Sequence, residues 1–63
     1  MKQKILGYKT NDGALISAFI AQGLIPGVLF QVLDAGKDTY LLDVDGRQIA
    51  LRHTEFTGIE CDQ

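Results

Sequence analysis

Residues 22–33 decide how this chain folds: Gln22-Gly23-Leu24-Ile25-Pro26-Gly27-Val28-Leu29-Phe30-Gln31-Val32-Leu33. Gly23 follows an apolar stretch with helical periodicity and suits the left-handed position at which many helices end. Pro26 presets φ for the first central position of a turn, and Gly27 supplies the positive φ that a type II turn needs at the second. The alternation that follows predicts a strand over residues 28–33. The segment therefore predicts a helix end, a rigid turn and a strand, in that order.

The residues before this segment predict a strand and a helix. Residues 5–8 suit a short first strand, and the polar residues 9–13 suit a loop. Over residues 12–22 the large apolar side chains form one helical stripe, which comprises Leu15, Ile16, Phe19 and Ile20. Asn11 or Asp12 can cap this helix by accepting a hydrogen bond from a free backbone N–H. Because a helix this short is marginal alone, we expect it to dock on a sheet.

Three further strands complete the predicted sheet, over residues 39–44, 47–52 and 58–61. Asp45-Gly46 is a strong signal for a two-residue type I′ turn, which pairs Leu42 with Ile49. The C-terminal part is expected to add three side chains to the interior, those of Phe56, Ile59 and Cys61. Five short strands and one helix predict a mainly β chain that forms a small, strongly bent antiparallel barrel.

The pairing of strand 28–33 with strand 39–44 follows from their apolar faces. The inward sets are Val28, Phe30 and Val32 on the first strand and Tyr40, Leu42 and Val44 on the second. Residues that face each other across a ladder share a face, so Val32 is expected opposite Leu42. The same register puts Asp34 opposite Tyr40 and leaves Gly36-Lys37-Asp38 as a three-residue loop.

Two motifs in this pattern resemble the FeoA family. They are Gly23-Leu24-Ile25-Pro26-Gly27 followed by a strand, and Asp45-Gly46-Arg47-Gln48-Ile49-Ala50-Leu51-Arg52 across a hairpin. The resemblance covers nearly the whole chain and implies one SH3-like domain over residues 1–63. Such domains are small cytosolic proteins encoded with the FeoB ferrous iron transporter, and they also occur appended to metal-dependent repressors. One departure is the short turn at residues 34–38, where many family members carry a longer excursion with Pro and Gly.

Composition limits the classes of function. With 63 residues the chain is near the lower limit for folding without a disulfide or metal, but its 46% hydrophobic content is ample for a core. One cysteine allows no internal disulfide, which favours a reducing compartment. No apolar run suits a signal peptide or a membrane span, so we expect a cytoplasmic protein without membrane insertion. The net charge of −2 argues against a nucleic-acid partner.

The residue types needed for catalysis are sparse. Ser17, His53 and Cys61 are the only serine, histidine and cysteine, and no pattern places an activating base beside a nucleophile. A phosphate-binding loop is missing as well, because Gln31 and Asp38 stand where that motif needs Gly and Ser or Thr. We therefore expect no enzyme activity and no cofactor.

The resemblance to an iron-transport family raises the question of transition metal ion binding. The candidate ligands lie near the C-terminus: His53, Glu55 and Cys61, with Glu60 and Asp62 beside them. Their spacing matches no known metal motif, and transition-metal sites usually draw on several His, Cys or carboxylate ligands. We therefore expect His53 and Glu55 to be solvated residues on a turn and Cys61 to be a small buried apolar residue.

The register also predicts an apolar row on the outer face of the sheet. Leu33 is expected opposite Leu41, Leu41 opposite Ala50, and Leu29 further along the same face. Three polar residues flank the row, namely Gln31, Asp43 and Gln48. Contiguous exposed apolar surface usually marks an interaction site, so this row is the candidate partner-binding surface. The alternative is that the helix, or the segment around residues 24–25, covers the row within the same molecule.

Two functions are compatible with this sequence. The resemblance implies an accessory protein of ferrous iron uptake that acts as an interaction module on the cytosolic side of a FeoB-like GTPase transporter. The alternative is an SH3-like adaptor or metalloregulator-type domain that binds another soluble protein. A weak homo-oligomer is compatible with either function.

Overall fold

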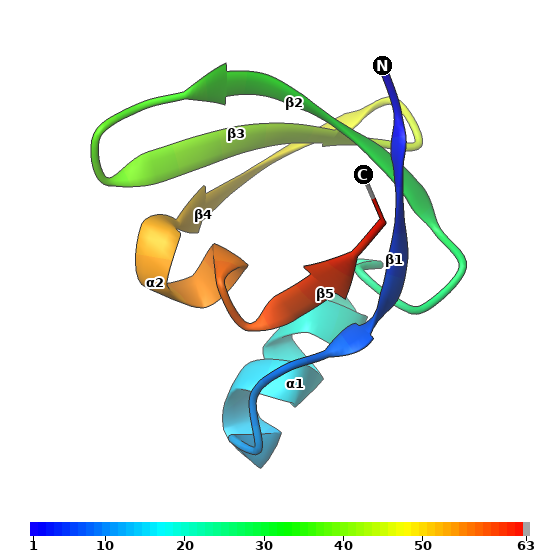
Figure 1. Ribbon diagram of the computed structural model, residues 1–63, viewed down its shortest axis with the longest axis vertical. Helices are drawn as coiled ribbons and strands as arrows, with labels where there is room; N and C mark the ends of the chain where they lie inside the picture. Colours follow the sequence, from blue (N-terminus) through cyan, green and yellow to red (C-terminus); the bar gives the residue numbers. More distant parts are fainter. Residues whose placement is uncertain (63) are drawn as a thin grey trace.

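The computed structural model describes residues 1–62. Its elements are, in chain order, β1 (Gln3–Tyr8), α1 (Gly13–Ala21), β2 (Leu29–Ala35), β3 (Thr39–Val44), β4 (Arg47–Arg52), α2 (His53–Phe56) and β5 (Ile59–Cys61). Within this part of the chain the strands form one antiparallel sheet in the order β4-β3-β2-β1-β5. The sheet bends round an interior but does not close, with β2 and β3 arching over β5 and α2 (Figure 1). The predicted fold class, a mainly β, SH3-like small barrel, is confirmed.

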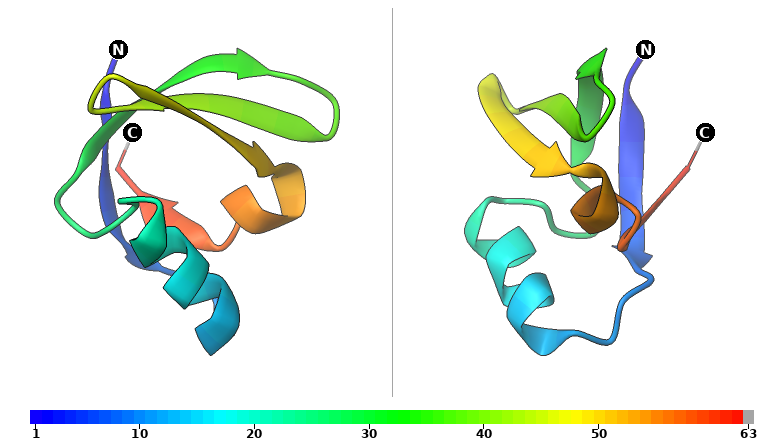
Figure 2. Two further views of the ribbon diagram at one scale, coloured as in Figure 1. Left: turned by 180° about the vertical axis from the view of Figure 1, so that it is seen from behind. Right: turned by 90° about the vertical axis from the view of Figure 1, so that its left-hand side faces the viewer.

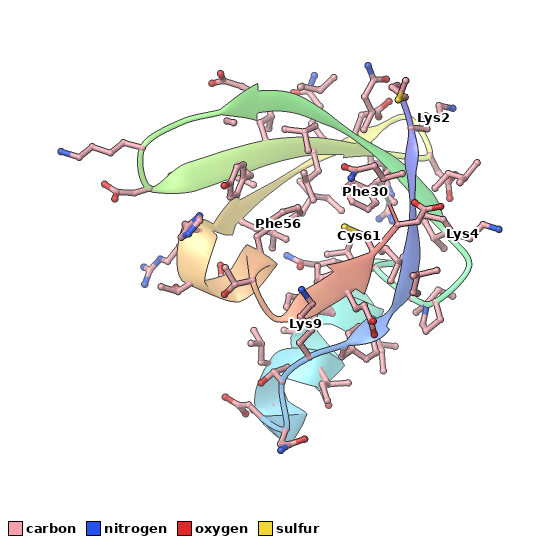
Figure 3. All side chains as sticks on the ribbon, viewed as in Figure 1. Lys2, Lys4, Lys9, Phe30, Phe56 and Cys61 are labelled. Carbon is pink, nitrogen blue, oxygen red and sulfur yellow. The ribbon has the colours of Figure 1, made fainter. Side chains whose placement is uncertain are left out.

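Apolar side chains fill the interior of the bent sheet. The most buried of them are Ile5, Phe19, Leu24, Phe30, Leu42, Val44, Leu51 and Ile59. Phe30 and Phe56 meet edge to face with ring centroids 6.1 Å apart, and the ring of Tyr40 lies 4.6 Å from that of Phe56. Figure 3 shows Phe30 and Phe56 pointing into this interior from opposite sides. Such aromatic pairs stabilise the core by more than their buried area alone.

Helix α1 has a defined cap at each end. Its N-terminus is capped by Asp12, whose Oδ1 accepts hydrogen bonds from the backbone N–H of Ala14 (3.0 Å) and Leu15 (3.3 Å). At the C-terminus Gly23 has a φ of +82°. The N–H of Gly23 donates to the carbonyl of Ile20, and the N–H of Leu24 donates to the carbonyl of Phe19. This pair of bonds is the Schellman motif. The predicted helix and its end at Gly23 are therefore confirmed.

The C-terminal end of α1 is also fastened to the sheet. The hydroxyl of Tyr8 donates to the carbonyl of Leu24 (2.6 Å), and Nη2 of Arg47 donates to the carbonyl of Gln22 (3.0 Å). The ring of Tyr8 stacks on that of Phe19, with centroids 5.8 Å apart. These contacts fix the helix below the open end of the barrel, away from the β2–β3 hairpin (Figure 2).

The turn that follows the helix has the predicted geometry. Gly27 has a φ of +94°, and the N–H of Val28 donates to the carbonyl of Ile25 (3.2 Å), as a type II turn requires. The turn is held against β1, because Gly27 donates to the carbonyl of Ile5 and Ile5 donates to that of Val28. The chain therefore enters β2 already paired with β1.

The β3–β4 hairpin also confirms the sequence-based register. Asp45 and Gly46 have φ values of +53° and +83°, as a type I′ turn requires at both positions. Leu42 lies opposite Ile49, and Leu41 lies opposite Ala50.

The β2–β3 register contains a β-bulge that the sequence analysis missed. Val32 lies opposite Leu42 as predicted, but Asp34 lies opposite Leu41, and Leu33 is the extra residue between them. The predicted pairs Asp34–Tyr40 and Leu33–Leu41 are therefore wrong. The physical reason is that an uninterrupted ladder would turn a carboxylate toward the core beside Tyr40, and burying an unpaired charge is costly. The bulge leaves Asp34 exposed and brings Ala35 opposite Tyr40.

The segment after β4 also differs from the prediction, since residues 53–56 form the short helix α2 rather than a turn. The carboxylate of Glu55 accepts a hydrogen bond from the backbone N–H of Arg52 (2.8 Å) and so satisfies a donor at the start of this helix.

The two ends of the described chain lie side by side. The N–H of Asp62 donates to the carbonyl of Lys4 (3.0 Å), and the N–H of Lys4 donates to Oδ1 of Asp62 (2.6 Å). Figure 1 shows β1 and β5 as neighbours that bring both ends to one side of the molecule.

Gly23→Ala should lower the free energy of unfolding by about 1–2 kcal/mol, because an L-residue in the left-handed region is strained by roughly that amount. The new Cβ would also lie 2.6 Å from Nη2 of Arg47 and displace that side chain. Gly13→Ala is the matched control, since a Cβ there meets nothing within 4 Å. Urea denaturation of both variants measures the difference. Equal stability of the two variants would contradict the role assigned to the helix end.

Candidate functional site

The candidate partner-binding surface lies on the outer face of the sheet. Leu29 and Leu33 on β2 are 46% and 45% exposed, which is high for leucine. Leu41 on β3 is half-buried, and its neighbour Ala50 on β4 is exposed. These four residues are called the outer-face patch below.

Helix α1 does not cover this surface. It lies at the other end of the molecule, where Phe19 enters the core (Figures 1 and 2). Leu24 is fully buried as well and is fixed by its hydrogen bond to Tyr8. The alternative in which the helix or the segment around residues 24–25 folds over the leucine row is therefore wrong.

The register divides the outer-face patch into two parts. Gln31, Asp43 and Gln48 face one another across β2, β3 and β4 and form a polar row. Leu33, Leu41 and Ala50 lie on one side of this row, whereas Leu29 lies on the other side, opposite Lys4 of β1. The three polar residues thus flank the larger apolar part, but they also separate Leu29 from it. The bulge brings Leu33 and Asp34 together opposite Leu41, so a carboxylate borders the larger apolar part.

Leu6, which was not among the predicted surface residues, adds to the smaller part of the surface. It is 52% exposed. It follows Lys4, the partner of Leu29, by two residues on β1. It is also the extra residue of a register shift against β5, between Ile5 and Gly7. The signal was available in the sequence, since Ile5 points inward and its neighbour in a strand must point outward.

The candidate metal ligands have separate surroundings. Nδ1 of His53 lies 3.1 Å from the hydroxyl of Tyr40, and the Glu55 carboxylate accepts the Arg52 N–H. Cys61 is half-buried on β5, with its sulfur 4.0 Å from Nε2 of Gln3. Figure 3 shows Cys61 directed into the interior. Residues 1–62 contain no group of three or more His, Cys, Asp or Glu side chains arranged to hold a metal ion.

The described residues also provide little for other chemistry. Ser17 is exposed on α1 and makes no hydrogen bond through its side chain among residues 1–62. No pocket is enclosed by this part of the chain. None of its helices has the length and apolar character needed to cross a membrane.

The fold defines a small, mainly β, SH3-like domain. The family model for the FeoA domain matches residues 2–63, and the chain belongs to the FeoA family. This membership supports an accessory role in ferrous iron transport. A comparison with curated proteins gave no match.

The chain alone should bind Fe²⁺ no more tightly than an exposed carboxylate does, because His53, Glu55 and Cys61 do not converge on one point. Anaerobic titration calorimetry should therefore show no stoichiometric micromolar site. His53→Ala should give the same titration curve as the unchanged protein. A stoichiometric site that is lost in His53→Ala would contradict this prediction.

Proposed function

We propose that this protein is a cytoplasmic accessory protein of ferrous iron uptake that binds the cytosolic side of a FeoB-like transporter through its outer-face patch. Its role in this proposal is non-catalytic: it contributes a binding surface, and any nucleotide hydrolysis belongs to the transporter. Family membership supports the biological setting.

The observation that carries the proposal is the exposure of Leu29 and Leu33 on the same face of the sheet. Protein interfaces combine apolar contacts with polar groups. The row of Gln31, Asp43 and Gln48 lies between Leu29 and the larger apolar part and supplies polar groups to the same surface. Exposure of apolar side chains to water is unfavourable in free energy. A partner that covers the patch removes this cost.

The second candidate function is an adaptor that binds another soluble protein through the same patch. Capture of proline-rich peptides is the version with less support. It needs an aromatic-lined groove, but the rings of Phe30 and Phe56 pack on each other in the interior and the sequence has no Trp. Binding to the purified cytosolic part of the transporter distinguishes the two candidates.

Leu33→Glu is the sharpest test of the patch. Leu33 is exposed and is the extra residue of the bulge, so the substitution should change stability by only about 0.5 kcal/mol. In the complex it would bury an unpaired carboxylate at a cost of about 2 kcal/mol or more, which weakens binding at least roughly 30-fold. Titration of the labelled protein with the cytosolic part of a FeoB-like transporter measures this loss.

Ile20→Glu is the matched control, because Ile20 is 53% exposed on α1 at the other end of the molecule. This variant should bind as the unchanged protein does. If both variants lose binding equally, the effect is one of net charge and the patch is not the docking surface. If only Ile20→Glu loses binding, the partner docks at the helix.

A further inference from the structure

Strand β4 leaves one edge of the sheet open. Within residues 1–62 the sheet has β4 at one edge and β5 at the other. Strand β5 has three residues and is thus too short to offer much backbone to a second strand, whereas β4 has six. The longer edge is therefore the one at which strand addition is geometrically favourable.

The register determines which backbone groups of β4 are free. In a two-residue hairpin the residues next to the turn, here Val44 and Arg47, exchange hydrogen bonds, and hydrogen-bonded pairs then alternate along the ladder. The N–H and C=O groups of Gln48 and Ala50 consequently point away from β3. Arg52 is two residues beyond Ala50, so its N–H should point away from β3 as well. It does, because this N–H donates to the side chain of Glu55. Among the described residues no backbone or side-chain group bonds to the free groups of Gln48 and Ala50.

This edge is protected by charge only at its ends, at Arg47 and Arg52. Natural edge strands carry a proline, a bulge or a charge in mid-strand. The β3–β4 ladder runs without a register shift from Thr39 to Arg47, and mid-strand Gln48 and Ala50 are uncharged. Both residues are exposed. The backbone of β4 is therefore accessible to a partner strand.

We propose that β4 pairs antiparallel with β4 of a second copy of this chain, about a two-fold axis at Ile49. In this register Gln48 of each copy lies opposite Ala50 of the other. Both are residues with outward backbone groups, so two hydrogen-bonded pairs form, each with two N–H···O=C bonds. Ile49, which is half-buried in one copy, lies opposite Ile49 of the other on the inner face.

Charge complementarity favours a second copy as the occupant. The same register brings Arg52 of one copy opposite Gly46 of the other, beside the exposed carboxylate of Asp45. The two-fold axis repeats this contact, so each Arg52 lies near an Asp45. Arg47, the other neighbour of Gly46, shares the inner face with Val44, and its Nη2 already donates to the carbonyl of Gln22. An isologous interface of this kind uses every favourable contact twice. A strand of another protein would need its own matching charges.

Ala50→Pro tests the pairing directly. Proline removes the N–H of Ala50, which bonds to nothing in the monomer, so the β3–β4 ladder keeps its bonds. Sedimentation equilibrium from micromolar to millimolar protein should show a monomer–dimer equilibrium for the unchanged chain and at least a tenfold weaker one for Ala50→Pro. Amide exchange gives the site: at high concentration the N–H groups of Gln48 and Ala50 should gain protection that they lack on dilution.

A second variant keeps the test valid if Ala50→Pro fails to fold. Asp45→Asn retains a residue that tolerates positive φ in the turn but removes the charge beside Arg52, so it should weaken dimerisation by about two- to fivefold. Asp43→Asn is the matched control, since Asp43 lies on β3 away from the edge and the variant should dimerise normally.

Three results would overturn the proposal. The first is a chain that remains monomeric at millimolar concentration. The second is dimerisation of unchanged strength in Ala50→Pro or in Asp45→Asn. The third is protection of Gln48 and Ala50 only when the cytosolic part of the transporter is added, which would assign the edge to a strand of that protein. Leu33→Glu should leave the dimer intact, so failure of this proposal is distinguishable from failure of the docking patch.

Discussion

The end of helix α1 is the constraint on which the rest of the structure depends. A positive φ at Gly23 lets the N–H of Leu24 reach the carbonyl of Phe19, and both side chains then enter the core together. Because the Tyr8 hydroxyl holds the carbonyl of Leu24, the same few atoms join the first strand to the helix end. Arg47 adds the third connection by bonding the carbonyl of Gln22 from the start of β4. A helix of nine residues, marginal by itself, is thereby fixed over the open end of the barrel.

Local backbone chemistry made most of this fold predictable. Gly23, Gly27 and Asp45-Gly46 each have a positive φ where the helix end or turn type demands it. These positions define where α1 ends and where β2 and β4 start. The two-residue turn fixes the β3–β4 register completely, because side-chain alternation leaves no freedom once the turn length is set. The helix cap was predicted to be Asn11 or Asp12, and the structure shows that it is Asp12.

The features that were not predicted, the bulge and the packing of α1, depend on groups that are far apart in the sequence. The bulge at Leu33 keeps the Asp34 carboxylate out of the core, but it leaves one residue of β2 without a partner in the ladder. Side-chain alternation alone does not tell which is the larger cost, a buried carboxylate or an interrupted ladder. An acidic residue at an inward position of a strand was the signal that could have indicated the bulge. For the candidate surface, alternation identified Leu29, Leu33, Leu41 and Ala50, but it could not show that α1 packs elsewhere. That result depends on the Tyr8 and Arg47 hydrogen bonds, which join residues far apart in the chain.

The paired ends of the chain have a consequence for how this domain can be joined to others. Two hydrogen bonds join Lys4 and Asp62, so the two ends of the domain lie next to each other. If the domain were inserted into another protein, its two connections would therefore attach at adjacent points. Closing so short a gap costs little chain entropy, and a few flexible residues suffice to link the ends into a ring. The exposed loop at residues 36–38 then offers a place to open the ring without breaking a buried contact. The same barrel should therefore form when its elements are connected in this circularly permuted order.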